Sequence, residues 1–424
     1  MLQKVSIGRH CYAPSANVEN HRALVGDDLV DEIAALARDL KGVRIAHVNS
    51  TAFGGGVAEL LARHLPVLQA LGVTAEWRLI HGEPEFFTVT KAFHNALQGA
   101  HYDLGERERN LYLEANRQAA QLLEHEYDVI VVHDPQPAAL RHFAGARGAK
   151  WIWRCHIDSS AADATVREFL APFIAEYDAL VFTMAEFLLP GLDGGRAAFI
   201  APAIDPLATK NMDLPLDVCR RAIADSGVDV NRPLLVQVSR FDPWKDPLGA
   251  IHAYRLVKQE VPDVQLALIG AMAGDDPEGW TMLERVEEEA AQDPDLFVFT
   301  NLAGVGSMEV NVFQRGSDVV IQKSLREGFG LVVSEALWKE KPVVASHVGG
   351  IPLQIKHKYS GLLCHSIEGA AFEIKQLLNS PEYAARLGKN GHEHVKNNFL
   401  LTRHLRDYML LFLSLYHPGD MVYL

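Results

Sequence analysis

The chain has 424 residues, of which 48% are hydrophobic and 22% charged, a balance that is ordinary for a globular protein and long enough for two domains. Its net charge of −14 argues against general affinity for nucleic acid or an anionic membrane surface. The longest apolar run, Met409 to Leu415, is too short to cross a bilayer, and the first residues lack the apolar core of a signal peptide. The four cysteines are far apart, without metal-ligand spacing, as expected for reduced thiols. We therefore expect a cytoplasmic protein.

Short β-rich runs alternate with helical patterns along most of the chain. In the first half, strands are predicted at 43–48, 129–133, 151–156 and 180–183, with helices at 56–71 and 111–124. In the second half, strands are predicted at 234–238, 265–269, 297–300, 319–322 and 343–345, with helices at 248–258, 281–291 and 331–339. Apolar strands that alternate with helices indicate parallel sheets covered on both faces.

A two-proline segment at 202–206 interrupts this pattern and predicts a domain boundary. We expect one Rossmann-like domain over 1–205, a second over 206–398, and an amphipathic helical segment over 399–424 that crosses back to the first domain. Ligands of such folds bind at the carboxyl ends of the strands. The predicted fold is therefore α/β, with two doubly wound domains that face a central cleft.

The segment Arg326-Glu-Gly-Phe-Gly-Leu-Val-Val-Ser-Glu335 follows an apolar strand and leads into a helix. Strand, glycine-rich bend and helix, in that order, place the free N–H groups of a helix N-terminus beside the bend, where they attract phosphate. The carboxylates of Glu327 and Glu335 would repel phosphate and are better suited to hydroxyl groups. Together these features predict a pocket for a sugar nucleotide.

Two cations follow the strand at 234–238, in Ser239-Arg-Phe-Asp-Pro-Trp-Lys-Asp246. Arg240 and Lys245 could neutralise a diphosphate, increasingly so as it separates as a leaving group. The alternative is a helix-capping loop with two solvated cations. The glutamate-containing segment of the same sheet favours the diphosphate.

The first strand of the first domain is followed by Asn49-Ser-Thr-Ala-Phe-Gly-Gly-Gly56. Its glycines let backbone N–H groups approach a charged or hydroxylated ligand closely. The spacing is not G-x-G-x-x-G, so a nicotinamide site is poorly supported. A glycine turn that only tightens the joint between strand and helix is the alternative.

Three further polar segments belong to the first domain. His133-Asp134 and Arg154-Cys-His-Ile-Asp158 end two strands, where they could hold sugar hydroxyls. Glu85 to Asn95 places aromatic residues beside Lys91 and an amide, which suits a carbohydrate as well as an amphipathic helix with its aromatic side in the core. No metal is expected, because the spacing of His and Asp resembles no zinc signature.

Taken together, these segments resemble the retaining family-4 glycosyltransferases of GT-B fold, whose paired-glutamate motif matches Glu327 and Glu335. The chain is more closely similar to the trehalose glycosyltransferring synthases. That likeness runs from about Val43 to the final helix, and it is carried by residues 48–59, 89–99, 132–140, 153–158, 238–245 and 326–330.

The resemblance implies reversible, retaining transfer of glucose from ADP-, UDP- or GDP-glucose to free glucose, which gives α,α-trehalose. The expected catalytic residues are Glu327, Arg240, Lys245 and His156. The expected donor-binding residues are Gly54, Gly55, Gly56, Arg240, Lys245, Glu327, Gly328, Phe329, Gly330 and Glu335, and the acceptor-binding residues are Asn49, Lys91, Asn95, His133, Asp134 and Asp158. In the implied roles, Arg240 and Lys245 hold the diphosphate, Glu335 the ribose hydroxyls, and His156 lies near the donor 6-hydroxyl.

The implied reaction requires no cofactor, and any Mg²⁺ would come with the nucleotide. A trehalose phosphorylase of the same fold, which uses inorganic phosphate, is the closest alternative, although such enzymes are longer and carry an N-terminal extension. A bilobal sugar-binding protein without catalysis is a second alternative, but it would need no diphosphate-binding cations and would normally carry a secretory signal. The nucleotide base, the direction of the reaction and a homodimer stay open.

Overall fold

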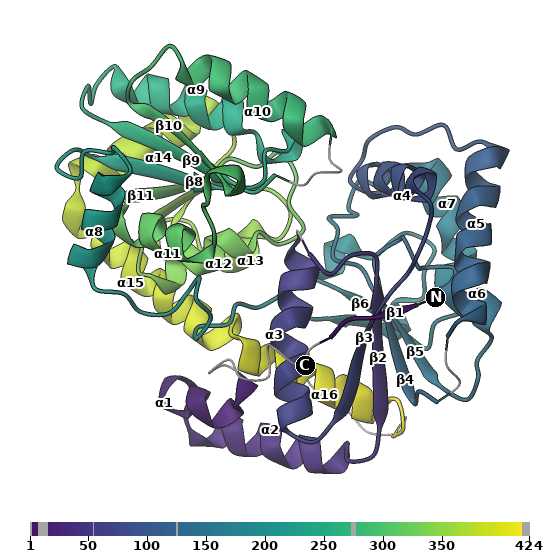
Figure 1. The fold of residues 1–424 in the computed structure, drawn as a ribbon. Helices are drawn as coiled ribbons and strands as arrows, with labels where there is room; N and C mark the ends of the chain where they lie inside the picture. Colours follow the sequence, from purple (N-terminus) through teal and green to yellow (C-terminus); the bar gives the residue numbers. More distant parts are fainter. Residues whose placement is uncertain (1, 7–15, 54, 124–125, 273–276, 418–424) are drawn as a thin grey trace. The chain divides into compact units, whose positions relative to one another are not determined.

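The computed structural model describes residues 2–6, 16–53, 55–123, 126–272 and 277–417 (Figure 1). The chain divides into two compact units, a first unit of Met1–Ala203 with Leu401–Leu424 and a second unit of Ile204–Leu400. Each unit contains one sheet of mainly parallel strands with helices on both of its faces. The predicted pair of Rossmann-like sheets is confirmed.

The sheet of the first unit has the strand order β1-β3-β2-β4-β5-β6-β7. Its strands are β1 (Gln3–Lys4), β2 (Arg44–Asn49), β3 (Thr74–Leu79), β4 (Val129–His133), β5 (Lys150–Arg154), β6 (Ala179–Phe182) and β7 (Ala197–Phe199). β1 pairs with β3 antiparallel, and the other described pairs are parallel. The strand order reverses between β2 and β4, the position where α/β sheets bind ligands.

Helices cover the two faces of this sheet in separate groups. They are α1 (Arg22–Val25), α2 (Asp27–Asp39), α3 (Gly56–Ala70), α4 (Pro84–Leu97), α5 (Glu106–Gln121), α6 (Leu140–Ala144), α7 (Ala164–Ile174) and α16 (Leu401–Ser414). Residues of α4 to α7 share one apolar core, and those of α2, α3 and α16 share the other. Figure 1 shows α16 beside α2 and α3, so a late segment of the chain closes this face.

The sheet of the second unit is fully parallel in its described pairs, with the order β10-β9-β8-β11-β12-β13. Its strands are β8 (Leu234–Val238), β9 (Gln265–Gly270), β10 (Leu296–Thr300), β11 (Val319–Gln322), β12 (Val343–Ser346) and β13 (Leu362–Cys364). The order reverses between β8 and β11, so the loops that follow these two strands are neighbours at the carboxyl edge.

The helices of the second unit also form two layers. They are α8 (Leu216–Asp225), α9 (Pro247–Lys258), α10 (Pro277–Ala290), α11 (Ser307–Gly316), α12 (Leu331–Trp338), α13 (Ile351–Gln354), α14 (Ile367–Asn379) and α15 (Pro381–Asn398). α9, α10 and α14 contribute to one apolar core, and α8 and α11 to the other. Within the described ranges, no helix combines the length and the apolar character that crossing a membrane requires.

The sequence analysis did not predict four of the described strands, namely β1, β3, β7 and β13. The reason is clearest for β3, whose charged residues are not typical of a strand although one of its sides is buried. Glu76 accepts a hydrogen bond from Arg78 over 2.8 Å and another from Tyr127 over 2.7 Å, while Trp77 is buried on the other side of the strand. The strand predicted at 151–156 ends earlier, at Arg154, so His156 lies in the loop beyond it.

We predict that Phe412→Ala lowers the free energy of unfolding of the first unit by about 3 to 5 kcal/mol, the usual cost of a buried Phe-to-Ala truncation. Phe412 is fully buried, and its ring centroid lies 5.8 Å from that of Tyr408. Denaturant unfolding of the variant measures the loss. Phe372→Ala on α14 is the matched control, because Phe372 is 55% exposed. Equal destabilisation by both changes would contradict the conclusion that α16 completes the apolar core on this face of the first sheet.

Candidate active site

Lys245 and Glu327 lie in contact in the second unit, although 82 residues separate them in the sequence. Lys245 Nζ donates a hydrogen bond to Glu327 Oε2 over 2.7 Å. Lys245 ends a short 3-10 helix, Pro243–Lys245, in the loop after β8, and Glu327 lies in the loop after β11. These strands are neighbours, so their loops bring together two of the predicted catalytic residues.

The carboxylate of Glu327 is held from several sides. Its side chain is 8% exposed, and Oε2 also accepts a hydrogen bond from Ser324 Oγ over 3.2 Å. Gln322 Nε2, at the end of β11, lies 3.5 Å from the same oxygen. A cation and two neutral donors on one oxygen of a buried carboxylate fix its orientation.

Arg240 is the more accessible cation of the same loop. Its side chain is 38% exposed, compared with 20% for Lys245. One guanidinium nitrogen donates to Asp242 Oδ2 over 3.1 Å, while Asp242 Oδ1 accepts from the backbone N–H of Trp244 over 2.9 Å. Asp242 thus shapes the loop and orients the guanidinium.

The bend between β11 and α12 depends on glycine. Gly330 has φ 82° and ψ 66°, in the left-handed region that glycine tolerates best, and it immediately precedes α12. A side chain at Gly350 would come within 2.5 Å of the carbonyl oxygen of Gly328. The predicted donor-binding residue Phe329 is buried, and its ring packs edge-on against Phe399 at 5.4 Å. Its backbone is therefore the part of Phe329 that can meet a donor.

Glu335 lies on α12 and is 1% exposed. Its Oε1 lies 3.3 Å from Lys210 Nζ, an ion pair that the sequence analysis missed. One turn later, the buried Lys339 donates to Gln314 Oε1 over 2.8 Å and to the carbonyl oxygen of Glu335 over 3.0 Å. Lys210 is the only basic residue between Ile204 and Pro215, and no local motif connects it with the helix it reaches.

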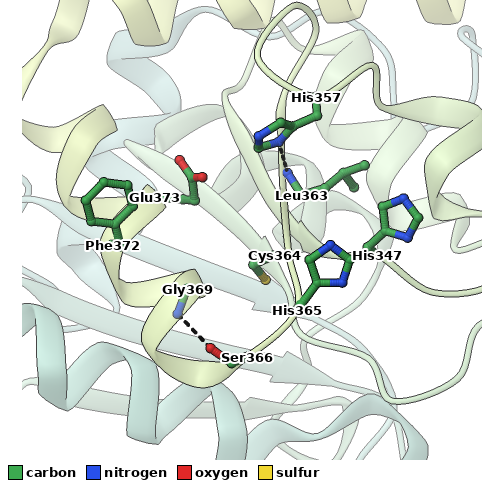
Figure 2. A pocket seen from close by; sticks show the side chains of 9 residues that line it. All are labelled: His347, His357, Leu363, Cys364, His365, Ser366, Gly369, Phe372 and Glu373. Carbon is green, nitrogen blue, oxygen red and sulfur yellow. Dashed lines mark hydrogen bonds between the residues drawn. The ribbon is translucent and has the colours of Figure 1, made fainter.

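A cavity of about 510 Å³ lies at the carboxyl ends of β12 and β13, and its lining includes none of the predicted residues (Figure 2). The rings of His347 and His365 stack there with centroids 5.0 Å apart, and the buried Glu373 belongs to the same lining. Nδ1 of His357 accepts a hydrogen bond from Leu363 N over 3.0 Å. Across the described part of the chain, no three His, Cys, Asp or Glu side chains are arranged to hold a metal ion.

In the first unit, the ends of β4 and β5 bring His133, Asp134 and His156 together. His133 Nδ1 and His156 Nε2 are 2.9 Å apart, and the backbone N–H of His156 donates to Asp134 Oδ1 over 2.7 Å. Asp134 has φ 63°, a left-handed conformation that residues other than glycine rarely adopt. Such backbone strain at a strand end is typical of a functional site.

Burial controls the charge of this group. It raises the pKa of Asp134 to about 7 and lowers the pKa values of His133 and His156 well below their ordinary value. The buried guanidinium of Arg154 lowers the two histidine pKa values further. Both imidazoles are therefore neutral at neutral pH, so each carries its proton on one of its two ring nitrogens.

Two more of the predicted acceptor-binding residues form hydrogen bonds within the first unit. Asn49 Oδ1 accepts from Trp77 Nε1 over 2.6 Å, and Asn49 Nδ2 donates to the carbonyl oxygen of Thr51 over 2.6 Å. Asp158 is buried, and its Oδ1 accepts from Ser160 Oγ over 2.6 Å. These bonds shape the loops that follow β2 and β5.

The predicted glycine loop leads directly into α3. Gly56 is the first residue of α3, and Gly55 precedes it as the capping residue. A side-chain carbon at Gly55 would meet no atom within 4 Å, so there is open space beside this backbone. Gly54 lies outside the described residues.

Lys91 and Asn95 lie one turn apart on the same side of α4. Asn95 Oδ1 is buried and accepts no hydrogen bond from the described residues, so a ligand hydroxyl could satisfy it. On the same helix, Phe86 and Phe93 are fully buried, which supports the core interpretation for these two rings.

Two family models match different parts of the chain. Residues 47–189 match the family model described as "Trehalose synthase, N-terminal domain", and residues 220–394 match "Glycosyl transferases group 1". A trehalose synthase of Rubrobacter xylanophilus is 51% identical over 98% of this chain and 99% of its own length. A trehalose phosphorylase of Pleurotus pulmonarius is 29% identical over 82% of this chain but only 54% of its own length.

Among solved structures, the fold is similar to that of sucrose-phosphate synthase from Thermosynechococcus elongatus. The TM-score is 0.69 at 18% identity, with 89% of this chain and 100% of that chain covered. The predicted GT-B fold is confirmed by this match together with the group 1 family model.

The raised pKa of Asp134 predicts a specific pH dependence of stability. A carboxyl group whose pKa rises from 3.8 to about 7 on folding contributes stability that is present below pH 3.8 and is lost as the pH rises through 7. Between these values, wild-type stability should fall relative to Asp134→Asn by up to about 1.4 kcal/mol per pH unit. Asparagine suits this position because it tolerates positive φ.

Denaturant unfolding of both proteins at several pH values measures this difference. Asp103→Asn is the control, because the Asp103 side chain is 96% exposed. Parallel pH profiles for the wild type and Asp134→Asn would contradict this prediction, because they would show that folding leaves the pKa of Asp134 unchanged.

Proposed function

The chain belongs to the trehalose synthase family of glycosyltransferases, and on this premise we propose that it transfers glucose reversibly, with retention, from a nucleoside-diphosphate glucose to free glucose, giving α,α-trehalose. The contact between Lys245 Nζ and Glu327 Oε2 supports this most directly. It joins a cation suited to the leaving diphosphate to a carboxylate suited to the hydroxyls of the transferred sugar.

The donor would occupy the carboxyl edge of the second unit. Arg240 and Lys245 neutralise the diphosphate, and the N-terminus of α12 adds backbone N–H groups at Gly330. Glu335 accepts hydrogen bonds from the ribose hydroxyls, with its charge balanced by Lys210. Glu327 accepts from hydroxyls of the donor glucose. Any Mg²⁺ would arrive with the nucleotide, and the nucleotide could carry adenine, uracil or guanine.

For the first unit, we propose residues that bind sugar hydroxyls. His156 contacts the 6-hydroxyl of the donor glucose. The acceptor glucose is bound by residues of the β4 and β5 loops and by Lys91 and Asn95 of α4. The buried oxygen of Asn95 supports this role, because a sugar hydroxyl would supply the hydrogen bond that the described residues do not.

The environment of Glu327 supports front-face transfer. A carboxylate that is bonded to Lys245 and Ser324 is a weak nucleophile, because both partners stabilise its negative charge. In the proposed step, the bond between the donor C1 and the diphosphate oxygen breaks, and the acceptor hydroxyl oxygen bonds to C1 on the same face. The departing diphosphate takes the hydroxyl proton. Lys245 and Arg240 stabilise the charge that develops on this leaving group.

Product analysis tests the proposed activity. The protein is incubated with trehalose and ADP, UDP, GDP or inorganic phosphate, and the glucosyl product is identified by mass spectrometry. We expect a nucleoside-diphosphate glucose and free glucose with at least one diphosphate. The similarity to trehalose phosphorylase makes phosphate the informative comparison. Glucose 1-phosphate from phosphate, with no product from any diphosphate, would assign the phosphorylase reaction instead.

We predict that Lys245→Ala and Arg240→Ala each lower kcat by about 100-fold or more, because each removes a charge that stabilises the departing diphosphate. Steady-state kinetics with trehalose and a nucleoside diphosphate measure the loss. Lys258→Ala is a matched control, since Lys258 is also paired with a carboxylate and is 26% exposed, but it lies at the C-terminal end of α9. Turnover within twofold of wild type in both loop variants would place the diphosphate elsewhere.

Substitutions of the two glutamates should change different kinetic constants. Glu335→Gln should mainly raise the KM for the nucleotide, because ribose contacts are equally strong in the ground state and the transition state. Glu327→Gln should mainly lower kcat, because it contacts the reacting sugar and loses its ion pair with Lys245. Initial rates over a matrix of nucleotide and trehalose concentrations resolve the two constants. Identical changes in both constants for both variants would refute this division of roles.

A further inference from the structure

A row of buried histidines runs inward from the carboxyl edge of the first unit. His156 Nε2 lies 2.9 Å from His133 Nδ1, and His133 Nε2 lies 3.0 Å from His47 Nδ1. His133 and His47 are 2% and 1% exposed, whereas His156 is partly exposed at the outer end of the row. Further inside, the His47 ring centroid lies 6.1 Å from that of His64, whose Nδ1 is 3.3 Å from His404 Nδ1.

The register of the sheet produces this row. His47 on β2 is paired with Val131 on β4, and His133 on β4 is paired with Arg154 on β5. In each step, the next histidine lies two residues beyond the register partner and therefore on the same face of the sheet. β2, β4 and the loop that follows β5 thus place His47, His133 and His156 in a diagonal line towards the carboxyl edge.

The two short nitrogen–nitrogen contacts couple the tautomers of these rings. Each contact needs one N–H donor and one lone pair, and burial keeps the three imidazoles neutral. The protons must therefore be ordered in one of two ways along the row. Either every ring donates towards the interior, or every ring donates towards His156.

The inner end of the row distinguishes these two arrangements. His47 Nε2 is buried and has no hydrogen-bond partner among the described residues. If the rings donate inwards, this nitrogen is a buried N–H without an acceptor, a kind of group that is rare in folded proteins. If they donate outwards, it is an unpaired acceptor, which occurs more often. Outward donation is therefore favoured, and it leaves the proton of His156 on Nδ1.

We propose that His47 and His133 are positioning residues that hold His156 as its Nδ1–H tautomer, so that His156 donates a hydrogen bond to an oxygen of the transferred sugar. The hydrogen bond from His156 to the sugar rests on the proposed function, because His156 is the residue expected at the 6-hydroxyl of the donor. The tautomer of His156 concerns the free protein and is independent of any substrate. The ligand class is a hexose hydroxyl acting as acceptor.

Nitrogen-15 NMR of protein labelled at histidine tests the tautomer in the absence of substrate. The signals of His156 are identified by their loss in His156→Asn. We expect the protonated nitrogen of wild-type His156 to be Nδ1. In His47→Asp, a carboxylate acceptor takes the place of the Nδ1–H donor, so His133 should donate from Nε2 and His156 should shift towards the Nε2–H form. His47→Asn should restore the wild-type spectrum, because its amide N–H can replace Nδ1–H of the imidazole.

His64→Phe is the matched control, since His64 belongs to the same buried cluster but makes no hydrogen bond to the three-ring row in the described structure. We expect kcat for glucosyl transfer to fall about tenfold in His47→Asp, the factor that corresponds to one net hydrogen bond, with the nucleotide KM unchanged. His47→Asn and His64→Phe should keep kcat within about twofold to threefold of wild type.

The tautomer of His156, measured by NMR, and the kcat values together distinguish failure of this inference from failure of the proposed function. An Nε2–H tautomer of His156 in the wild type, or a His156 spectrum unaffected by His47→Asp, overturns the inference whatever the activity. Equal losses of kcat in His47→Asp and His64→Phe also overturn it, because they indicate a general disturbance of the buried cluster. Absence of glucosyl transfer by the wild type rejects the proposed function alone.

Discussion

The ion pair between Lys245 and Glu327 is the interaction on which the architecture of the second unit converges. Forming it requires β8 and β11 to be adjacent, the loop after β8 to turn through a short 3-10 helix, and the bend after β11 to pass through glycine. A buried carboxylate without its cation would be strongly destabilising, so the pair constrains both loops at once. The pair thereby fixes a positive and a negative group side by side at the carboxyl edge of this sheet, as the proposed donor requires.

The predictable part of the site is the part encoded in continuous segments. The spacing of Glu327 and Glu335, the glycines between them and the cations after β8 are local patterns, and the parallel sheet brings two of them into contact. Lys210 could not be predicted in the same way, because its partner Glu335 lies 125 residues away by sequence number and no pattern joins them. β3 was missed because charged side chains that satisfy each other make a strand with a buried side resemble a loop.

The histidine row shows a second limit of sequence reasoning. His133 and His156 stand beside Asp residues at strand ends, and this proximity made them recognisable. His47 lies within an apolar strand, and His64 and His404 lie within helices, where an isolated histidine carries no signal. These histidines lie together because of the strand register and the packing of α3 and α16 on one face of the sheet. Register and helix packing are properties of the folded sheet and cannot be read from a local sequence pattern.

The place of α16 in the first unit has a consequence for biosynthesis. A ribosome completes the whole of Ile204–Leu400 before α16 exists, yet the sheet face lined by α2 and α3 needs Leu405, Tyr408 and Phe412 to finish its core. Until then, apolar side chains of the first unit remain uncovered, a condition that favours chaperone binding or aggregation. The nascent first unit therefore has to wait for a segment made after its neighbour, whereas the second unit is continuous and can fold as soon as it emerges.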